Sequence, residues 1–484
     1  MAWFGFVLLV MVGVGIIATG IPAAVVLMAI AAFGAATGVA AGAIDAATLW
    51  ALPSRLINLL ENDLLQALPL YVTMGLLLDR LPVADALYRG AQAVLPRKPS
   101  APLVSGMLLG ALLGPMNGSV GASVLALSRV VAPRLAAEGI AAPHRHAIVA
   151  VASTPGVLVP PSLVLILLSD AMLSAHTIAV TATGRADRVV NTQDIFHAAL
   201  LPGGIFLVLC LALSGVVGRS ATRLPDRAPL TAGQGWTAAI ALVSLLVLLG
   251  GVAIGYFYAV EAAAMGAFAL LVAGLLSGRL ARAALNELLR DAIALTGALF
   301  SLLLAATTFT MVLRLLGTAD LAGKMVSSIP GGDVAAVAVV LGVIALSAFV
   351  LDAFEIIFVI VPIVIPPLLI RVADARWVSV LVLLTLQSSF LLPPFGYALM
   401  MVRGVLKEPV AFRAFLRALA PFLAAQWFLL LLVLLFPQLT HLGKPSDEGS
   451  RLPPANLSDG EFNRRLNEMI KLPEPETDGG SVGR

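Results

Sequence analysis

Apolar segments long enough to cross a membrane follow one another along almost the whole chain. A run of 18 or more apolar residues with few charges predicts a transmembrane helix, and only short connectors separate the runs of this sequence. Charged residues make up 12% of the chain, whereas a soluble domain contains roughly a quarter. The sequence therefore predicts an all-α polytopic membrane protein.

The expected helices differ in length, and several are too short or too interrupted for a simple crossing of ~20 residues. We place them at residues 3–20, 21–43, 64–80, 102–115, 146–170, 198–218, 236–254, 257–278, 291–317, 333–350, 356–372, 377–402 and 417–438. The amphipathic segment 48–62 is expected to lie along the membrane interface. The first run lacks a preceding basic region, so we interpret it as a spanning helix rather than a cleaved signal peptide.

Basic connectors predict the orientation of the chain. One connector holds Arg219, Arg223 and Arg227, and another holds Arg279, Arg282 and Arg290. Two spans separate them, so both should face the same side, and the positive-inside rule makes that side the cytoplasm. The segment around Glu261 then faces outward, where this carboxylate is either a helix cap or a functional group.

The sequence also predicts a division into segments. We expect N-terminal scaffold spans at 1–101, a first repeat at 102–218, central scaffold spans at 219–290, a second repeat at 291–416, a C-terminal span at 417–442 and a disordered polar tail at 443–484. The tail is rich in proline, glycine and charge, which is typical of disorder.

Four polar islands interrupt the apolar background, two in each half. They are "NGS" (117–119), "STPGVLVPPS" (153–162), "LDAFEIIFVIVPIVIPP" (351–367) and "LQSSFLLPPFG" (386–396). The separation of Asn117 from Pro160 nearly equals that of Asp352 from Pro393. Interrupted hydrophobic segments at corresponding positions of two halves indicate the binding site of a secondary transporter, because freed backbone groups are tolerated at membrane depth only beside a cavity or ligand.

The islands provide candidate ligands of two kinds. Carbonyls, hydroxyls and a carboxylate are hard oxygen ligands suited to an alkali cation, and the N-termini of half-helices attract an anion. The candidate binding residues are Asn117, Gly118, Ser119, Ser153, Thr154, Gly156, Asp352, Glu355, Gln387, Ser388 and Ser389, and the helix-breaking prolines are Pro160, Pro161, Pro393 and Pro394.

Structural explanations of these residues remain open. Small and hydroxyl side chains also stabilise packing between membrane helices. An acid within a span indicates function by default, but Asp352 and Glu355 could instead pair with Arg314 or Lys324. No histidine lies in an island, no phosphate-binding loop is present, and the basic residues do not form a nucleic-acid-binding pattern.

At these islands the chain resembles the large membrane subunit of the tripartite ATP-independent periplasmic (TRAP) transporters, the DctM-like proteins. The similarity extends from about Ile17 to Pro437 and includes "GIPAAVVLMAI", "LENDLLQALPLYVTMGLLLDR", "NGSVGASVLALSRVVAPRL", "STPGVLVPPSLVLILLSD" and "GYFYAVEAAAMGA". The segments "LDAFEIIFVIVPIVIPP" and "LQSSFLLPPFGYALMMVRGV" resemble a branch associated with mannitol, chloroaromatic or 2-oxo-acid transport. Leu392 stands where the family usually has threonine, and Thr385 where it usually has asparagine.

The resemblance implies a sodium-coupled secondary importer of an organic acid in the bacterial inner membrane. It implies two inverted-repeat halves with re-entrant hairpins, an elevator mechanism, and sodium ligands among Ser119, Thr154 and Asp352. The implied partners are a small four-span membrane subunit and a periplasmic solute-binding protein, and no cofactor beyond the coupling ion is expected. Two alternatives remain: a two-component sodium–dicarboxylate symporter without a binding protein, and an intramembrane lipid-modifying enzyme.

Overall fold

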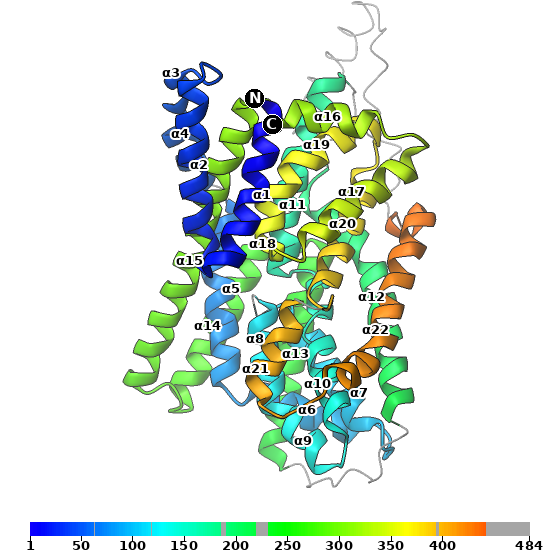
Figure 1. Cartoon of the computed structure of the whole chain (residues 1–484). Helices are drawn as coiled ribbons and strands as arrows, with labels where there is room; N and C mark the ends of the chain where they lie inside the picture. Colours follow the sequence, from blue (N-terminus) through cyan, green and yellow to red (C-terminus); the bar gives the residue numbers. More distant parts are fainter. Residues whose placement is uncertain (62, 118, 185–189, 219–230, 394–395, 442–484) are drawn as a thin grey trace, which may run out of the picture. The chain divides into compact units, whose positions relative to one another are not determined.

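The computed structural model describes residues 1–61, 63–117, 119–184, 190–218, 231–393 and 396–441. Within these ranges the secondary structure is helical and contains no β-strand (Figure 1). Gly118, Pro394, the connector with Arg219, Arg223 and Arg227, and the polar tail lie outside the described residues.

The helices of the two halves have the following bounds. The first half contains α1 (Ala2–Thr19), α2 (Ala23–Ala40), α3 (Ala46–Leu49), α4 (Leu52–Leu60), α5 (Asp63–Arg80), α6 (Val83–Val94), α7 (Ala101–Leu113), α8 (Val120–Val130), α9 (Ala132–Ala137), α10 (Ala142–Ala152), the 3-10 turn η1 (Pro155–Val157), α11 (Leu163–Thr183) and α12 (Thr192–Val217). The second half contains α13 (Ala232–Ile254), α14 (Ala259–Leu276), α15 (Arg282–Leu315), α16 (Thr318–Ser327), α17 (Asp333–Ser347), α18 (Ala353–Glu355), the π-helical turn η3 (Ile356–Ile360), α19 (Val361–Arg371), α20 (Ala375–Ser389), α21 (Tyr397–Leu406), α22 (Phe412–Leu435) and the 3-10 turn η4 (Pro437–Thr440).

The helices confirm the polytopic membrane architecture. In the described part of the chain, ten helices are long and apolar enough to cross a membrane, and α5 and α6 form a further pair bent by 66°. Shorter apolar helices include α7, α17 and α21, so the expected segments at 102–115 and 333–350 are shorter than a full crossing. This agrees with the expectation that several segments do not simply span the membrane.

Several expected boundaries were wrong. The expected span at 291–317 begins nine residues earlier because Arg80 of α5 holds the first turns of α15, binding the Ala284 carbonyl and the Asp291 carboxylate, each at 2.7 Å. The expected span at 198–218 begins at Thr192, where Asn191 and Asp194 form a capping box. The expected interfacial segment 48–62 overlaps two short helices, α3 and α4.

The same arrangement of elements occurs in both halves, related by inversion. In the first half, α7 and α8 form a hairpin, and a helix broken into α10 and α11 follows it. In the second half, α17 and α18–α19 form the hairpin, and α20 and α21 form the broken helix. In Figure 1, α7, α8 and α10 lie toward the bottom of the view, whereas α17, α19 and α20 lie toward the top. The two hairpins therefore enter from opposite sides, within the expected repeats 102–218 and 291–416.

Ion pairs join the bent pair α5–α6 to α8 and α9, at the end of the first hairpin that lies away from its tip. Arg134 of α9 pairs with Asp85 of α6, and its guanidinium carbon lies 4.7 Å from the centre of the Tyr88 ring. A second pair, between Arg129 and Asp79, has N and O atoms 2.7 Å apart. The side chain of Arg129 is 61% exposed and that of Arg134 only 24%, so the Arg134 pair should be the more stabilising of the two.

We expect Arg134→Gln to lower the free energy of unfolding by about 1–2 kcal/mol, since it removes a partly buried ion pair and a cation–π contact. Arg129→Gln is the matched control and should cost about 0.5 kcal/mol or less, as exposed pairs usually do. Thermal unfolding of the purified variants in detergent measures both. A greater loss from the Arg129 variant would contradict this order.

Candidate functional site

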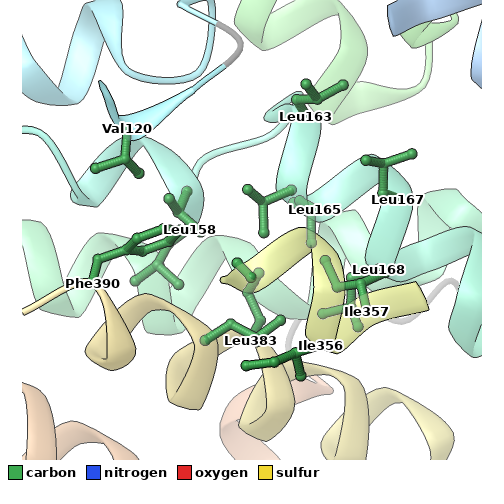
Figure 2. Close-up of a cluster of buried hydrophobic side chains, with 14 of the residues drawn as sticks. Val120, Leu158, Leu163, Leu165, Leu167, Leu168, Ile356, Ile357, Leu383 and Phe390 are labelled. Carbon is green, nitrogen blue, oxygen red and sulfur yellow. The ribbon is translucent and has the colours of Figure 1, made fainter. Parts of the chain in front are cut away.

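Buried side chains from all four interrupted elements gather in one hydrophobic cluster. Figure 2 shows Val120 at the start of α8, Leu158 after η1, Ile356 in η3 and Phe390 at the end of α20. Each of these side chains is 6% exposed or less. Because a close-packed interior holds its elements at fixed positions, this cluster brings the polar islands of the two halves into one region.

The tip of the first hairpin is built from its own hydrogen bonds. Ser119 is the N-cap of α8, and its hydroxyl accepts from the Ala122 amide at 3.1 Å. Asn117 is buried and its amide nitrogen donates to Ser123 Oγ at 3.1 Å. The carbonyl oxygen of Asn117 lies 2.6 Å from the position that a Cβ atom at Gly75 would occupy. The hairpin tip therefore packs directly against the backbone of α5.

The first broken helix packs against the first hairpin through glycine. A Cβ atom on Gly156 would lie 2.4 Å from the Cα and carbonyl carbon of Gly114. One on Gly110 would lie 1.9 Å from the Ala152 carbonyl oxygen. These backbones approach each other closely only because the side chains are absent. The end of α7 thus lies against the break between α10 and α11, which includes the buried prolines Pro160 and Pro161.

Hydroxyl groups line both breaks and share one bonding pattern. Each donates to a backbone carbonyl of the preceding turn at 2.6–2.9 Å: Ser153 to Ala150, Thr154 to Val151, Ser388 to Thr385 and Ser389 to Leu386. A hydroxyl that donates its proton keeps its lone pairs for another partner. These four oxygens can therefore accept a hydrogen bond or bind a cation.

One hydrogen bond connects the two broken helices. Gln387 Nε2 donates to Thr154 Oγ1 at 3.2 Å, and both side chains are completely buried. Gln387 Oε1 has no hydrogen-bond partner within the part of the chain that the structure describes. A buried polar atom without a partner is costly and calls for an explanation such as an ion or ligand. The amide oxygen thus lies between two breaks, beside hydroxyls with free lone pairs.

The tip of the second hairpin holds both acidic candidates. Asp352 is the N-cap of α18, and its carboxylate accepts from the Glu355 amide at 2.8 Å. The Glu355 carboxylate accepts in return from the Asp352 amide at 3.0 Å. This reciprocal capping box gives Glu355 a structural role, and neither acid has an ion pair with Arg314 or Lys324 in the described structure.

A cavity of about 340 Å³ adjoins Asp352 and joins it to the second break. Ser389 and Tyr397 line the same cavity, which extends to Ile17 of α1 and Met400 of α21. The Tyr397 hydroxyl lies 2.6 Å from the position that a Cβ atom on Gly121 of α8 would occupy. The cavity wall therefore includes residues of both halves.

The sequence analysis missed Tyr397. Its signal was available, because this polar aromatic residue is the first residue of α21 and follows the second break directly. The backbone of that break turns tightly: the Gly396 amide donates to the Leu392 carbonyl at 2.8 Å, and a Cβ atom on Gly396 would lie 2.7 Å from the Phe390 carbonyl oxygen. Pro393 lies in this turn.

The candidates form three groups rather than one. Thr154 and Gln387 meet, Asp352 and Ser389 share a cavity, and Asn117 and Ser119 bond within their own hairpin. Among the described candidates, Thr154 and Gln387 bond to each other across two elements, whereas the serines bond within their own elements.

Other polar residues have structural roles. Glu261 caps α14, accepting from the Tyr258 amide at 2.9 Å, which confirms the capping alternative. Arg403 stacks over the Phe412 ring, with its guanidinium carbon 5.4 Å from the ring centre. Across the residues described here, His, Cys, Asp and Glu side chains form no group of three that could hold a metal.

One protein family matches most of the chain. Residues 6–439 match the family described as "Tripartite ATP-independent periplasmic transporter, DctM component". The C4-dicarboxylate TRAP transporter large permease protein DctM of Rhodobacter capsulatus is 26% identical over 222 residues, which is 44% of this chain and 49% of that protein. That match spans about half the length of the relative.

Longer matches include two other permeases. The Pseudomonas aeruginosa C4-dicarboxylate permease DctM is 23% identical over 79% of this chain and 85% of its own length. The ectoine TRAP transporter large permease protein TeaC of Halomonas elongata is 21% identical over 77% of this chain and 84% of its own length.

The fold is similar to that of a solved transporter. The crystal structure of the Alcanivorax borkumensis YdaH transporter, which has an unusual topology, superposes with a TM-score of 0.58 at 14% identity, covering 81% of this chain and 90% of that one. This similarity concerns the fold alone. With the family match across residues 6–439, the chain belongs to the DctM component family of the tripartite ATP-independent periplasmic transporters.

Proposed function

We propose that this protein is the large permease subunit of a sodium-coupled importer of an organic acid. The observation that carries the proposal is the contact between the two broken helices, where Gln387 donates to Thr154 and keeps an unpartnered amide oxygen. Membership in a family of transporter permeases supports transport of a solute and sets aside the alternative of a lipid-modifying enzyme.

The proposed cation site uses oxygen ligands from the breaks. Gln387 Oε1 and the lone pairs of Thr154 provide hard, neutral ligands in a fully buried place. Asp352 supplies a negative charge in the neighbouring cavity. Sodium suits such ligands, because it binds hard oxygens and needs no dedicated thiolate or imidazole. Ser119, at the tip of the first hairpin, is the remaining candidate and contributes if the hairpin moves toward the break.

The proposed solute is a carboxylate. The half-helix α8 begins at the tip of the first hairpin, after Ser119, and its N-terminal end carries partial positive charge. Two of the matched permeases are named for C4-dicarboxylates and others for sialic acid and ectoine. The family thus handles different solutes, which is consistent with a separate binding protein that selects among them.

The proposed partners are a small four-span membrane subunit and a periplasmic solute-binding protein, in the bacterial inner membrane. The tripartite family name supports them. We further propose an elevator movement, in which the two hairpins and broken helices move together against α1, α2, α5, α14 and α15. The close contacts of the first hairpin with the first broken helix, and the hydrogen bond from Gln387 to Thr154 between the broken helices, support a common movement of these elements.

Uptake into proteoliposomes tests this function. The chain is reconstituted with its small subunit and binding protein, and labelled 2-oxo acids, lactate and C4-dicarboxylates are offered under imposed sodium or proton gradients. We expect uptake only with all three components and an inward sodium gradient. Uptake that persists without the binding protein would support the two-component symporter, and uptake driven only by protons would refute sodium coupling.

We expect Asp352→Asn to reduce sodium-driven uptake at least tenfold while leaving thermal stability nearly unchanged. Asparagine caps a helix about as well as aspartate, so the substitution removes the charge and keeps the bond to the Glu355 amide. The control is Asp45→Asn, since Asp45 caps α3 through the Ala47 amide at 3.0 Å. Equal uptake by the two variants would remove Asp352 from the site.

A further inference from the structure

A second and larger cavity lies away from the polar breaks, between two pairs of helices. It has a volume of about 840 Å³ and lies among α6, α7, α12 and α13. Its walls are apolar and include Gly90 and Val94 of α6, Gly235 and Ala253 of α13, and Val159 and Pro160. We call this cavity the α6–α13 groove. The groove reaches Pro160 and therefore borders the first broken helix.

The length of the groove matches the membrane. Gly235 and Ala253 lie near the two ends of α13, and at 1.5 Å per residue they are ~27 Å apart. The hydrocarbon core of a bilayer is ~30 Å thick. Glycine keeps the groove open, since no heavy atom lies within 4 Å of the position that a Cβ atom on Gly250 would occupy.

Two basic residues lie close in sequence to one end of the groove. Leu95 lines the groove and the exposed Arg97 and Lys98 follow it in the chain. A Cβ atom on Gly218 at the end of α12 would lie 2.4 Å from the Cα atom of Ser100. This end of the groove therefore lies near the end of α12, which the arginines that follow in the sequence assign to the cytoplasmic side by the positive-inside rule. Neither Arg97 nor Lys98 has an ion pair within the described residues.

The lining and the charge favour a lipid. All lining side chains are apolar, and two basic residues, Arg97 and Lys98, follow one end of the groove in the chain. A narrow apolar channel with a cationic end fits a molecule with long hydrocarbon chains and an anionic head, and basic pockets between membrane helices on the cytoplasmic side bind such head groups.

We propose that an anionic glycerophospholipid occupies the α6–α13 groove. Its acyl chain lies along α13 and reaches Pro160, and its phosphate lies at Arg97 and Lys98. The lipid fills the space among these helices and keeps water from the first broken helix. This binding site does not depend on the coupling ion or the solute.

Native mass spectrometry of the full-length chain tests the proposal. The purified protein is exchanged against vesicles of phosphatidylglycerol or of phosphatidylcholine with the same acyl chains. We expect one retained phosphatidylglycerol, preferred over phosphatidylcholine by roughly thirtyfold, which is the effect of two basic residues near a lipid surface. Inorganic phosphate should not displace it, because the acyl chain provides much of the binding.

Two kinds of variant locate the lipid. Gly250→Phe should abolish retention of both lipids by filling the groove, whereas Gly297→Phe should not, because Gly297 is an equally open glycine of α15 outside the groove. Arg97→Gln with Lys98→Gln should remove the preference for phosphatidylglycerol only. Equal retention of the two lipids by the unmodified protein, or unchanged retention by the Gly250 variant, would overturn the proposal. Retention of a protein subunit in the groove instead of lipid would also overturn it.

Discussion

Gln387→Leu should raise the sodium concentration needed for half-maximal uptake at least tenfold. Leucine removes the unpartnered Oε1 and the amide that donates to Thr154, and its side chain is similar in volume to that of glutamine. Removing one oxygen ligand should weaken the binding free energy of the buried cation by about 1.4 kcal/mol, which corresponds to a tenfold lower affinity. The measurement is the sodium dependence of uptake into proteoliposomes at a fixed solute concentration.

Gln426→Leu is the matched control for this substitution. Gln426 is also fully buried, donates to a backbone carbonyl (that of Leu384, at 3.0 Å) and has an unpartnered Oε1. It belongs to α22 rather than to either break. We expect its replacement to affect thermal stability by a similar amount and to leave the sodium dependence unchanged. If both variants shifted the sodium dependence equally, Gln387 would be an ordinary packing residue.

Gly156→Ala should destabilise the protein strongly, although it adds only one methyl group. The added methyl group would lie 2.4 Å from two backbone atoms of Gly114, and neither can move without shifting α7. Overpacking of this kind costs about 1–3 kcal/mol and sometimes more, and a contact with backbone leaves no side chain to yield. We therefore expect at least ~3 kcal/mol and poor recovery of folded protein.

Gly204→Ala provides the comparison. Gly204 lies within α12, and no heavy atom lies within 4 Å of its added Cβ position. Alanine favours a helix over glycine by about 1 kcal/mol, so this variant should unfold at the same temperature as the unmodified protein or a higher one. Thermal unfolding and size-exclusion profiles of both variants measure their stability and their recovery as folded protein. A Gly156 variant as stable as the Gly204 variant would show that α7 and the break do not pack as described.

The membrane architecture and the breaks could be predicted from the sequence because both leave local signals. Apolar runs mark spans, and polar islands with prolines mark interruptions, as the turn from Phe390 to Gly396 shows. The boundaries were less predictable. α15 extends back to Arg282 because Arg80, far away in the sequence, binds its first turns. No pattern within the segment contains that information.

The sequence could predict individual residues of the candidate site but not the contacts between them. Hydroxyls and carboxylates at the breaks were identifiable, but the sequence could not show that Gln387 meets Thr154. Such contacts depend on packing between elements that are far apart in the chain. Tyr397 could be identified from its place directly after the second break, but its position beside Gly121 and Asp352 arises from the meeting of the two halves.

Binding of radioactive sodium to the purified chain tests the central claim most directly. The account predicts saturable binding by the unmodified protein and by Gln426→Leu, and strongly weakened binding by Gln387→Leu and Asp352→Asn. Thermal unfolding first shows which variants are folded, and those are compared at equal protein concentration. Saturable sodium binding that is the same in all four proteins, or absent from the unmodified chain, would contradict a cation site at the meeting of the broken helices.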